Sequence, residues 1–242
     1  MGERMEIKDF ELLSNSRICK DTFRMTLSGC GPFKPGQFVN IRIDGKYLRR
    51  PISVCDYEDG RLTLIYKVVG DGTRALSSQK SGTVNLLYPL GNGYNLDKAT
   101  KKTVLIGGGV GVPPLYFLAK ELIKRGIKPS VILGFLDADS AFLYREFEEL
   151  GLNVKVATND GSMGTKGFVT DISTDGYDML YCCGPEPMLR SVYKLPIDGE
   201  FSFEERMGCG FGACMGCSCK TVTGYKRICK EGPVLAKSEI LW

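Results

Sequence analysis

A group of four cysteines near the C-terminus restricts the possible folds and functions of this chain more than any other feature. They are Cys209, Cys214, Cys217 and Cys229, in the spacing C-x4-C-x2-C-x11-C. Two irons need four thiolates that converge from different directions, and C-x4-C-x2-C with a distant fourth cysteine is the plant-type spacing for a 2Fe–2S cluster. Glycines beside the first three cysteines let a short loop turn tightly and direct its N–H groups at sulfur. The pattern therefore predicts a 2Fe–2S cluster on these four side chains.

Zinc binding and redox-active thiols are the alternative interpretations of the same residues. Zinc sites usually combine C-x2-C with a second such pair or with histidine, and this chain has no histidine. Cys219 alternates with Cys217 along "CSCKTVTG", so on a strand it faces the opposite side, and we expect it not to be a ligand. The other cysteines are expected to be small core residues: Cys19, Cys30, Cys55, Cys182 and Cys183.

Composition narrows the possible functions. The 242 residues are 43% hydrophobic and 25% charged, with a formal net charge of +4, which is typical of a globular protein. No apolar run reaches the roughly 18 residues of a membrane span. The densest basic run, "KATKK" at 98–102, favours a solvated loop over a nucleic-acid surface. Ten cysteines and an N-terminus without an apolar signal core favour reduced thiols, so we expect a cytoplasmic protein with no membrane or nucleic-acid partner.

The first part of the chain contains short strand-like segments. They lie at 23–29, 37–43, 61–69 and 82–90, and Gly, Pro and Asp-Gly turns separate them. Short strands at regular intervals with turn signals between them predict an antiparallel barrel or sandwich.

From residue 103 onward, apolar strands alternate with helices. "TVLIGGGVGVPPLYFLAKELIKRG" has the pattern of a buried strand, a glycine-rich turn and a helix, and "KPSVILGFLD", "NVKVATND" and "DMLYCCGP" are further strands. This alternation predicts a doubly wound parallel sheet. The expected organisation is multi-domain β plus α/β, with a β-barrel at 1–98, an α/β domain at 99–200 and a small cluster-binding domain at 201–242.

Two features of the α/β part suggest a nucleotide. "GGGVGVPPL" at 107–115 follows the first strand and opens a helix, where N–H groups can hold a phosphate, although it lacks G-x-G-x-x-G and could be only a tight turn. Asp137 ends the second strand, where a carboxylate can accept from a ribose hydroxyl and repel a 2′-phosphate; a helix N-cap is the alternative. Asp137 therefore favours NAD over NADP.

The barrel part carries two candidate phosphate contacts. "LRRPISVCD" at 48–56 is expected between two strands, where Arg and Ser could hold a pyrophosphate, a surface arginine pair being the alternative. In "GDGTRALS" at 70–77, Thr73 is expected to cap a short helix whose N-terminus faces a phosphate.

Together, "RRPIS", "YKVVGDGT", "PLGNGY", "GGGVGVPP", "CCGPEPML" and "FEERMGCGFGACMGCSC" resemble the electron-transfer subunits of dihydroorotate dehydrogenase B, a group within the ferredoxin–NADP reductase superfamily. The resemblance follows the same order and covers nearly the whole chain. It implies that the barrel binds FAD, the α/β domain binds NAD and the tail holds the 2Fe–2S cluster. The FAD contacts it implies are Arg50, Pro51, Ile52, Ser53, Ile65, Tyr66, Lys67, Gly72 and Thr73, with Ile52 in place of the usual aromatic residue. The NAD contacts it implies are Gly107, Gly108, Gly109, Val110, Gly111, Asp137, Cys183, Gly184, Pro185 and Glu186.

The same resemblance implies a partner, an FMN-containing catalytic subunit that oxidises dihydroorotate to orotate in pyrimidine biosynthesis, in a heterotetramer with two copies of each chain. Electrons would pass from that FMN to the cluster, then to FAD, and as hydride to NAD⁺. No acid or base suited to dihydroorotate is visible in this chain, so no catalytic residue is expected in it.

Three alternatives stay open. Subunits of NADH-dependent ferredoxin–NADP oxidoreductases and of sulfide dehydrogenases resemble the chain too, but they commonly have Asp at the first cluster position, where this chain has Cys209. A stand-alone NADH-dependent reductase and a zinc-binding interaction module are the other two.

Overall fold

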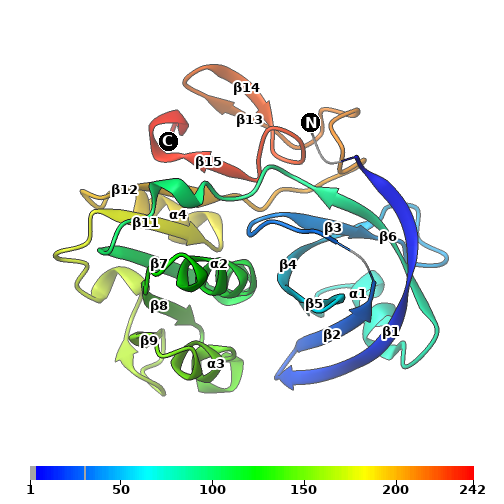
Figure 1. Ribbon diagram of the computed structural model, residues 1–242, viewed down its shortest axis with the longest axis horizontal. Coiled ribbons are helices and arrows are strands. Elements are labelled where there is room, and N and C mark those ends of the chain that lie inside the picture. Colours follow the sequence, from blue (N-terminus) through cyan, green and yellow to red (C-terminus); the bar gives the residue numbers. More distant parts are fainter. Residues whose placement is uncertain (1–3, 30) are drawn as a thin grey trace.

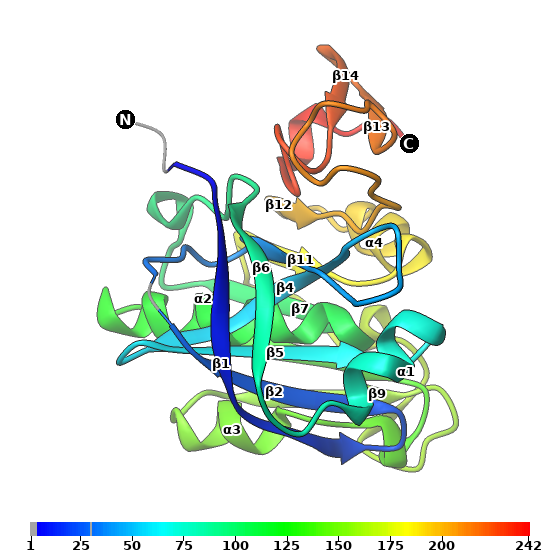
Figure 2. The same ribbon diagram turned by 90° about the vertical axis from the view of Figure 1, so that its right-hand side faces the viewer.

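The computed structural model describes residues 4–29 and 31–242, so the expectation for Cys30 lies outside the described residues. A β-barrel formed by the first third of the chain lies beside an α/β unit, and the C-terminal segment lies across both (Figures 1 and 2). This arrangement confirms the expected combination of a barrel, a parallel-sheet unit and a small tail.

The barrel is closed and antiparallel, with strand order β1-β2-β5-β4-β3-β6. Its strands are β1 (Glu6–Cys19), β2 (Thr22–Ser28), β3 (Phe38–Ile41), β4 (Arg50–Glu58), β5 (Arg61–Lys67) and β6 (Thr83–Leu90), and α1 (Asp71–Ser78) connects β5 to β6. Alternate side chains on each strand fill the interior, where Met25, Leu27, Leu62 and Leu64 are fully buried. Closure leaves no free sheet edge.

Three expectations for the barrel were wrong in detail. No strand was expected before residue 23, yet β1 spans 14 residues; only three of its positions are buried, so its apolar alternation is weak. The segment 48–56 does not lie between strands, because β4 begins at Arg50. Thr73 is not the helix cap: Gly70 is, and the Thr73 hydroxyl lies one turn in, accepting from the N–H groups of Val69 and Gly70 at 2.9 and 3.2 Å.

The α/β unit has a seven-stranded sheet with the order β10-β9-β8-β7-β11-β12-β15. Its strands are β7 (Thr103–Gly108), β8 (Ser130–Phe135), β9 (Val154–Thr158), β10 (Thr165–Lys166), β11 (Met179–Cys183), β12 (Asp198–Ser202) and β15 (Val234–Ala236). Its helices are α2 (Val112–Lys124), α3 (Tyr144–Glu149) and α4 (Glu186–Tyr193). Short 3-10 helices are η1 (Leu96–Lys98), η2 (Gly109–Gly111), η3 (Ala138–Ser140), η4 (Val169–Asp171) and η5 (Lys237–Glu239). All strand pairs are parallel except β12 with β15.

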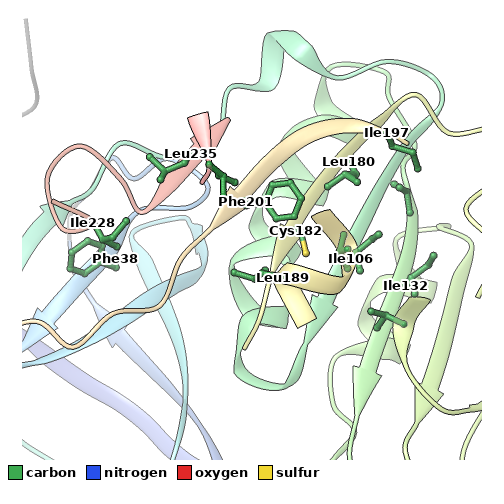
Figure 3. Packing of buried hydrophobic residues seen from close by; sticks show 14 of the residues in the cluster. Phe38, Ile106, Ile132, Leu180, Cys182, Leu189, Ile197, Phe201, Ile228 and Leu235 are labelled. Carbon is green, nitrogen blue, oxygen red and sulfur yellow. The ribbon is translucent and has the colours of Figure 1, made fainter. Parts of the chain in front are cut away.

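The two faces of this sheet carry different helices. Leu105 of β7 packs with side chains of α2 and α3, whereas its neighbour Ile106 packs with Leu189 and Val192 of α4 (Figure 3). Successive strand residues point to opposite faces, so both faces are covered and the sheet is doubly wound, as predicted.

The C-terminal segment is joined to both larger parts. It forms a hairpin from β13 (Ser218–Thr221) and β14 (Gly224–Arg227), and β15 then adds an antiparallel edge to the large sheet. Ile228 packs beside Phe38 of the barrel in one continuous core cluster (Figure 3). β12 crosses the expected domain boundary at residue 200, and β15 of the tail belongs to the large sheet. The domain boundaries at 98 and 200 remain predictions.

Candidate functional site

The β13–β14 hairpin brings the two buried cluster cysteines together. Cys217 directly precedes β13, and Cys229 follows β14 by two residues. The hairpin register pairs Ser218 with Arg227, so the chain ends that leave it lie side by side. The Cys229 N–H accordingly faces the Cys217 sulfur at 3.4 Å, and both cysteines are 2% exposed.

The other two predicted ligands lie on the preceding loop. Cys209 is half-buried and Cys214 is exposed. The N–H groups of Ala213 and Cys214 point at the Cys209 sulfur at 3.2 and 3.4 Å, and the Gly216 N–H points at the Cys214 sulfur at 3.5 Å. Desolvation is the largest single influence and raises the pKa of Cys209, but hydrogen bonds, first from the backbone of Cys214 and then from Phe211, outweigh it and lower this pKa to about 6. The N–H groups of the loop therefore favour the thiolate form of Cys209.

The four thiols lie in two pairs, Cys217 with Cys229 and Cys209 with Cys214, as the N–H to sulfur contacts within each pair show. Tetrahedral zinc on this chain would require four thiolates around one point. In a 2Fe–2S cluster each iron takes two cysteines and two bridging sulfides, so the ligands need only approach in pairs. The Cys217–Cys229 pair and the exposed loop with Cys209 and Cys214 fit that requirement.

Cys219 points away from the cluster loop. It is half-buried, and desolvation raises its pKa. With Glu186, Arg190, Glu204 and Trp242, among others, it lines a cavity of about 190 Å³ between the tail and α4. That Cys219 is not a ligand remains a prediction.

The adjacent arginines at the start of β4 have different surroundings. Arg49 donates to the Asn85 side-chain oxygen at 2.7 Å and to the Asn40 carbonyl at 3.1 Å, so it ties strands together. The Arg50 guanidinium lies over α1: a Cβ added at Gly72 would be 2.6 Å from its Nε. A cation above the first turn of a helix, with no side chain between them, is suited to a pyrophosphate.

The other predicted FAD contacts differ in their burial and in the partners of their side chains. Pro51, Ile52 and Ser53 are half-buried on β4, whereas Ile65 is buried against the α/β unit. Tyr66 is 1% exposed, stacks on Phe23 and donates its hydroxyl to Asn15 at 2.9 Å, so only its backbone is available to a ligand. Lys67 forms an ion pair with Asp21 at 3.0 Å. The FAD contacts of these residues remain predictions.

The predicted NAD segments meet at the carboxyl ends of β7 and β11. A Cβ at Gly111 would lie 2.4 Å from the Cys183 carbonyl carbon, and one at Gly108 would lie 2.4 Å from the Met188 sulfur. Because the Gly111 contact is with backbone, glycine is required there for the two turns, Gly107–Gly111 and Cys183–Glu186, to approach each other. Parallel sheets bind nucleotides at this edge.

Asp137 follows β8 by two residues and caps η3. Its Oδ1 accepts from the Ser140 N–H at 2.8 Å and from the Ser140 hydroxyl. The N-cap alternative thus describes its present contacts, and a ribose contact remains a prediction.

Sequence reasoning missed Glu204, which follows β12. The residue is exposed, yet the surrounding protein removes enough water to raise its pKa, as at the wall of a cleft. Burial, and then the charge of Glu204, raise the pKa of Cys183, so this carboxylate lies near a predicted NAD contact. No motif in the sequence links the two residues.

Comparison with known proteins finds a matching domain and relatives that cover nearly the whole chain. Residues 204–241 match the iron–sulfur cluster binding domain of dihydroorotate dehydrogenase B. The chain is 44% identical to the dihydroorotate dehydrogenase B (NAD(+)) electron transfer subunit of Fusobacterium nucleatum, over 98% of the chain and 99% of that protein. It is 42% identical to the same subunit of a Geobacillus species, with the same coverage of both chains.

Solved structures with a similar fold are oxidoreductases. The structure of the NADH-dependent reduced ferredoxin–NADP oxidoreductase superposes with a TM-score of 0.86 at 29% identity, over 96% of this chain and 90% of that one. Phthalate dioxygenase reductase superposes at 0.66 with 19% identity, over 89% and 87% of the two chains, and shows the fold alone. No helix among the described residues is long and apolar enough to cross a membrane. From its near full-length relatives, the chain belongs to the family of dihydroorotate dehydrogenase B (NAD(+)) electron transfer subunits.

Proposed function

We propose that this chain carries electrons between a dihydroorotate-oxidising partner and NAD⁺, through a 2Fe–2S cluster and FAD. The observation that carries the proposal is the cysteine loop: N–H groups face the Cys209 and Cys214 sulfurs on a loop that packs against the barrel. When bound, the cluster supplies one-electron transfer, and the flavin joins it to the two-electron chemistry of nicotinamide.

The chain's own residues hold and orient these groups. Cys209, Cys214, Cys217 and Cys229 are the proposed cluster ligands. Arg50 and the first turn of α1 hold the FAD pyrophosphate, because the guanidinium lies over Gly72. The turns at 107–111 and 183–186 hold NAD at the sheet edge, with Asp137 directed to the ribose.

The partner is proposed to dock on the cluster loop. Phe211 and Met215 are 43% and 54% exposed on either side of the exposed Cys214. Large exposed apolar side chains beside a redox centre suit a protein–protein contact. We propose an FMN-containing catalytic subunit there, in a heterotetramer with two copies of each chain. A cytoplasmic location is part of the proposal and is supported by the nine described cysteines, all of which are free.

Substrate oxidation is assigned to the partner. The chain contains no histidine, and the described cysteines outside the cluster loop are buried or half-buried, several with a raised pKa. Raised thiol pKa values are those of unreactive core residues.

Reconstitution tests the proposal. The isolated, cofactor-loaded chain should oxidise NADH with artificial acceptors but should not oxidise dihydroorotate, and adding the FMN-containing partner should restore NAD⁺-linked orotate formation. Cys214→Ser should lose its cluster, about two irons per chain, and its complex with the partner should lose NAD⁺-linked orotate formation. The matched variant Cys219→Ser should keep both. Dihydroorotate oxidation by the chain alone, or full activity of the complex with Cys214→Ser, would contradict the proposal.

A second candidate is a subunit of an NADH-dependent ferredoxin–NADP oxidoreductase, favoured by the high structural similarity to that enzyme. Activity with reduced ferredoxin and NADP⁺, in place of dihydroorotate and NAD⁺, would favour this candidate.

A further inference from the structure

Asn40 is a buried amide between the barrel and the cluster loop. It lies on β3 and is 1% exposed. Its neighbours Val39 and Ile41 fill the barrel core, so Asn40 and Phe38 point out of the barrel on the opposite face. Phe38 packs beside Ile228 of the tail (Figure 3). This face of β3 is therefore the surface on which the cluster segment lies.

The amide contacts the backbone of a predicted cluster ligand. Asn40 Nδ2 donates to the Cys209 carbonyl at 3.3 Å. The next residue, Gly210, has φ +79°, and a Cβ there would lie 2.3 Å from Asn40 Nδ2. The loop thus presses directly onto the amide, and both its left-handed backbone and the lack of space require glycine.

The backbone of Asn40 belongs to the flavin side. Asn40 pairs with Pro51 of β4, within the segment 50–53 that we propose for FAD. Its carbonyl accepts from Arg49, the residue before that segment. One residue therefore connects the cluster ligand loop to the strand that holds the flavin.

The other end of the amide has no hydrogen-bond partner. Across the described part of the chain, Asn40 Oδ1 is the one buried side-chain oxygen without one. An unpaired buried oxygen is costly, and an apolar residue of similar shape would remove that cost. An apolar residue, however, supplies no donor for the Cys209 carbonyl. A donor at this position therefore comes with an amide oxygen that no protein group pairs.

We propose that Asn40 is a positioning residue that fixes the cluster loop against the flavin strand and so sets the rate of electron transfer between the two cofactors. The inference rests on the proposed function for the identity of the cofactors, but not for the identity of the partner. Its test therefore uses the isolated chain with NADH as the only reductant.

The test compares Asn40→Leu and Asn40→Val with the unchanged chain, all loaded with FAD and cluster. Both variants remove the donor and place no new polar group in the buried site. We expect both to keep FAD and about two irons, but NADH-driven reduction of the cluster should slow, because the rate of electron transfer falls as the distance between the two cofactors grows. The electron paramagnetic resonance signal of the reduced cluster should shift as well.

Asn92→Leu is the matched control. Asn92 also ties the tail to the body, through the carbonyls of Glu231 and Val234 at 3.1 and 2.8 Å, but it does not contact the cluster loop. It should lower the melting temperature and leave cluster reduction unchanged. Cluster loss in both Asn40 variants, with retention in Asn92→Leu, would overturn the proposal, because Asn40 would then be needed to retain the cluster and not to set the rate.

Unchanged reduction rates and spectra in both loaded Asn40 variants would overturn it, as would equal slowing in Asn92→Leu. Failure of the proposed function would be detected separately, as absence of dihydroorotate-dependent NAD⁺ reduction by the unchanged chain with its partner.

Discussion

Arg49 and Arg50 are adjacent in the sequence but differ in what they bind. Arg49 is directed into the strand network through Asn85 and Asn40, and burial, followed by the charge of Arg42, lowers its pKa. Arg50 lies over the glycine of α1 instead. Arg49 precedes β4 and Arg50 begins it, so the two roles are separated by the partners that the fold brings to each side chain.

Arg50→Ala should therefore weaken FAD binding by about 1.5–3 kcal/mol, since it removes a charge-assisted hydrogen bond. Arg49→Ala is the matched control and should lower the melting temperature with FAD affinity little changed. Titration of the apoprotein with FAD, followed by flavin fluorescence, measures the first effect. Equal loss of affinity in both variants would show that the arginines act together.

At the scale of elements, one lysine joins the barrel to the α/β unit. Lys120 of α2 donates to Asp56 and Glu58 of β4 at 2.7 and 2.9 Å, and its side chain is 12% exposed. Arg24 of β2 and Glu146 of α3 form a second ion pair across the same interface, at 2.5 Å. These contacts hold β4 and β2 of the barrel in a fixed relation to α2 and α3 of the α/β unit.

Lys120→Met should destabilise the protein by about 1–3 kcal/mol, because it leaves the partly buried Asp56 carboxylate without its partner. Burial is the largest single influence on Lys120 and lowers its pKa, but hydrogen bonds to Asp56 and Glu58 outweigh it and raise the pKa above 10.5. The hydrogen bond to Lys120 lowers the pKa of Glu58 below 4.5.

The pH dependence of stability follows from the lowered pKa of Glu58 and the raised pKa of Lys120. A lowered carboxylate pKa contributes stability above 4.5 that is lost as the pH falls through the folded value; a raised lysine pKa contributes stability below 10.5 that is lost as the pH rises through the folded value. The difference in stability between the unchanged chain and Lys120→Met should thus be largest near neutral pH and shrink at both extremes. Urea unfolding at several pH values measures it, and a difference independent of pH would contradict this account.

At the scale of the whole molecule, the tail lies across the other two parts and presents its loop outward. β15 completes the large sheet (Figure 1), Ile228 packs on the barrel (Figure 3), and Phe211 on the loop is 43% exposed. The tail is thus held by the barrel and the large sheet, while its cluster loop is exposed to a second protein. This arrangement suits an electron carrier between two proteins.

Phe211→Ser should weaken binding of the catalytic partner about tenfold or more, as expected for a central aromatic contact. Iron content and NADH oxidation by the isolated chain should not change. Val222→Ser, at the exposed tip of the β13–β14 hairpin, is the matched control and should bind normally. Calorimetric titration of the two subunits provides the affinities, and equal weakening by both variants would place the docking surface elsewhere.

The sequence by itself determined the local features: the cysteine spacing, the alternation of strands and helices after residue 103, and the glycine turns. Each of these depends on neighbours within a few positions, so periodicity and spacing reveal them. Even so, β1 escaped detection, because only three of its 14 positions face the core. Cysteine spacing predicted the 2Fe–2S cluster, whereas family resemblance supplied FAD and the FMN-containing partner, which no local pattern names.

Only the tertiary structure decided which of these residues act together. The orientation of Arg50 away from Arg49, the enclosure of Tyr66 in the barrel and the contact of Asn40 with Cys209 each depend on residues from separate strands or loops. Asn40 and Cys209 are 169 positions apart in the chain. Contacts over such separations arise from chain topology and packing, which leave no periodic signal in the sequence.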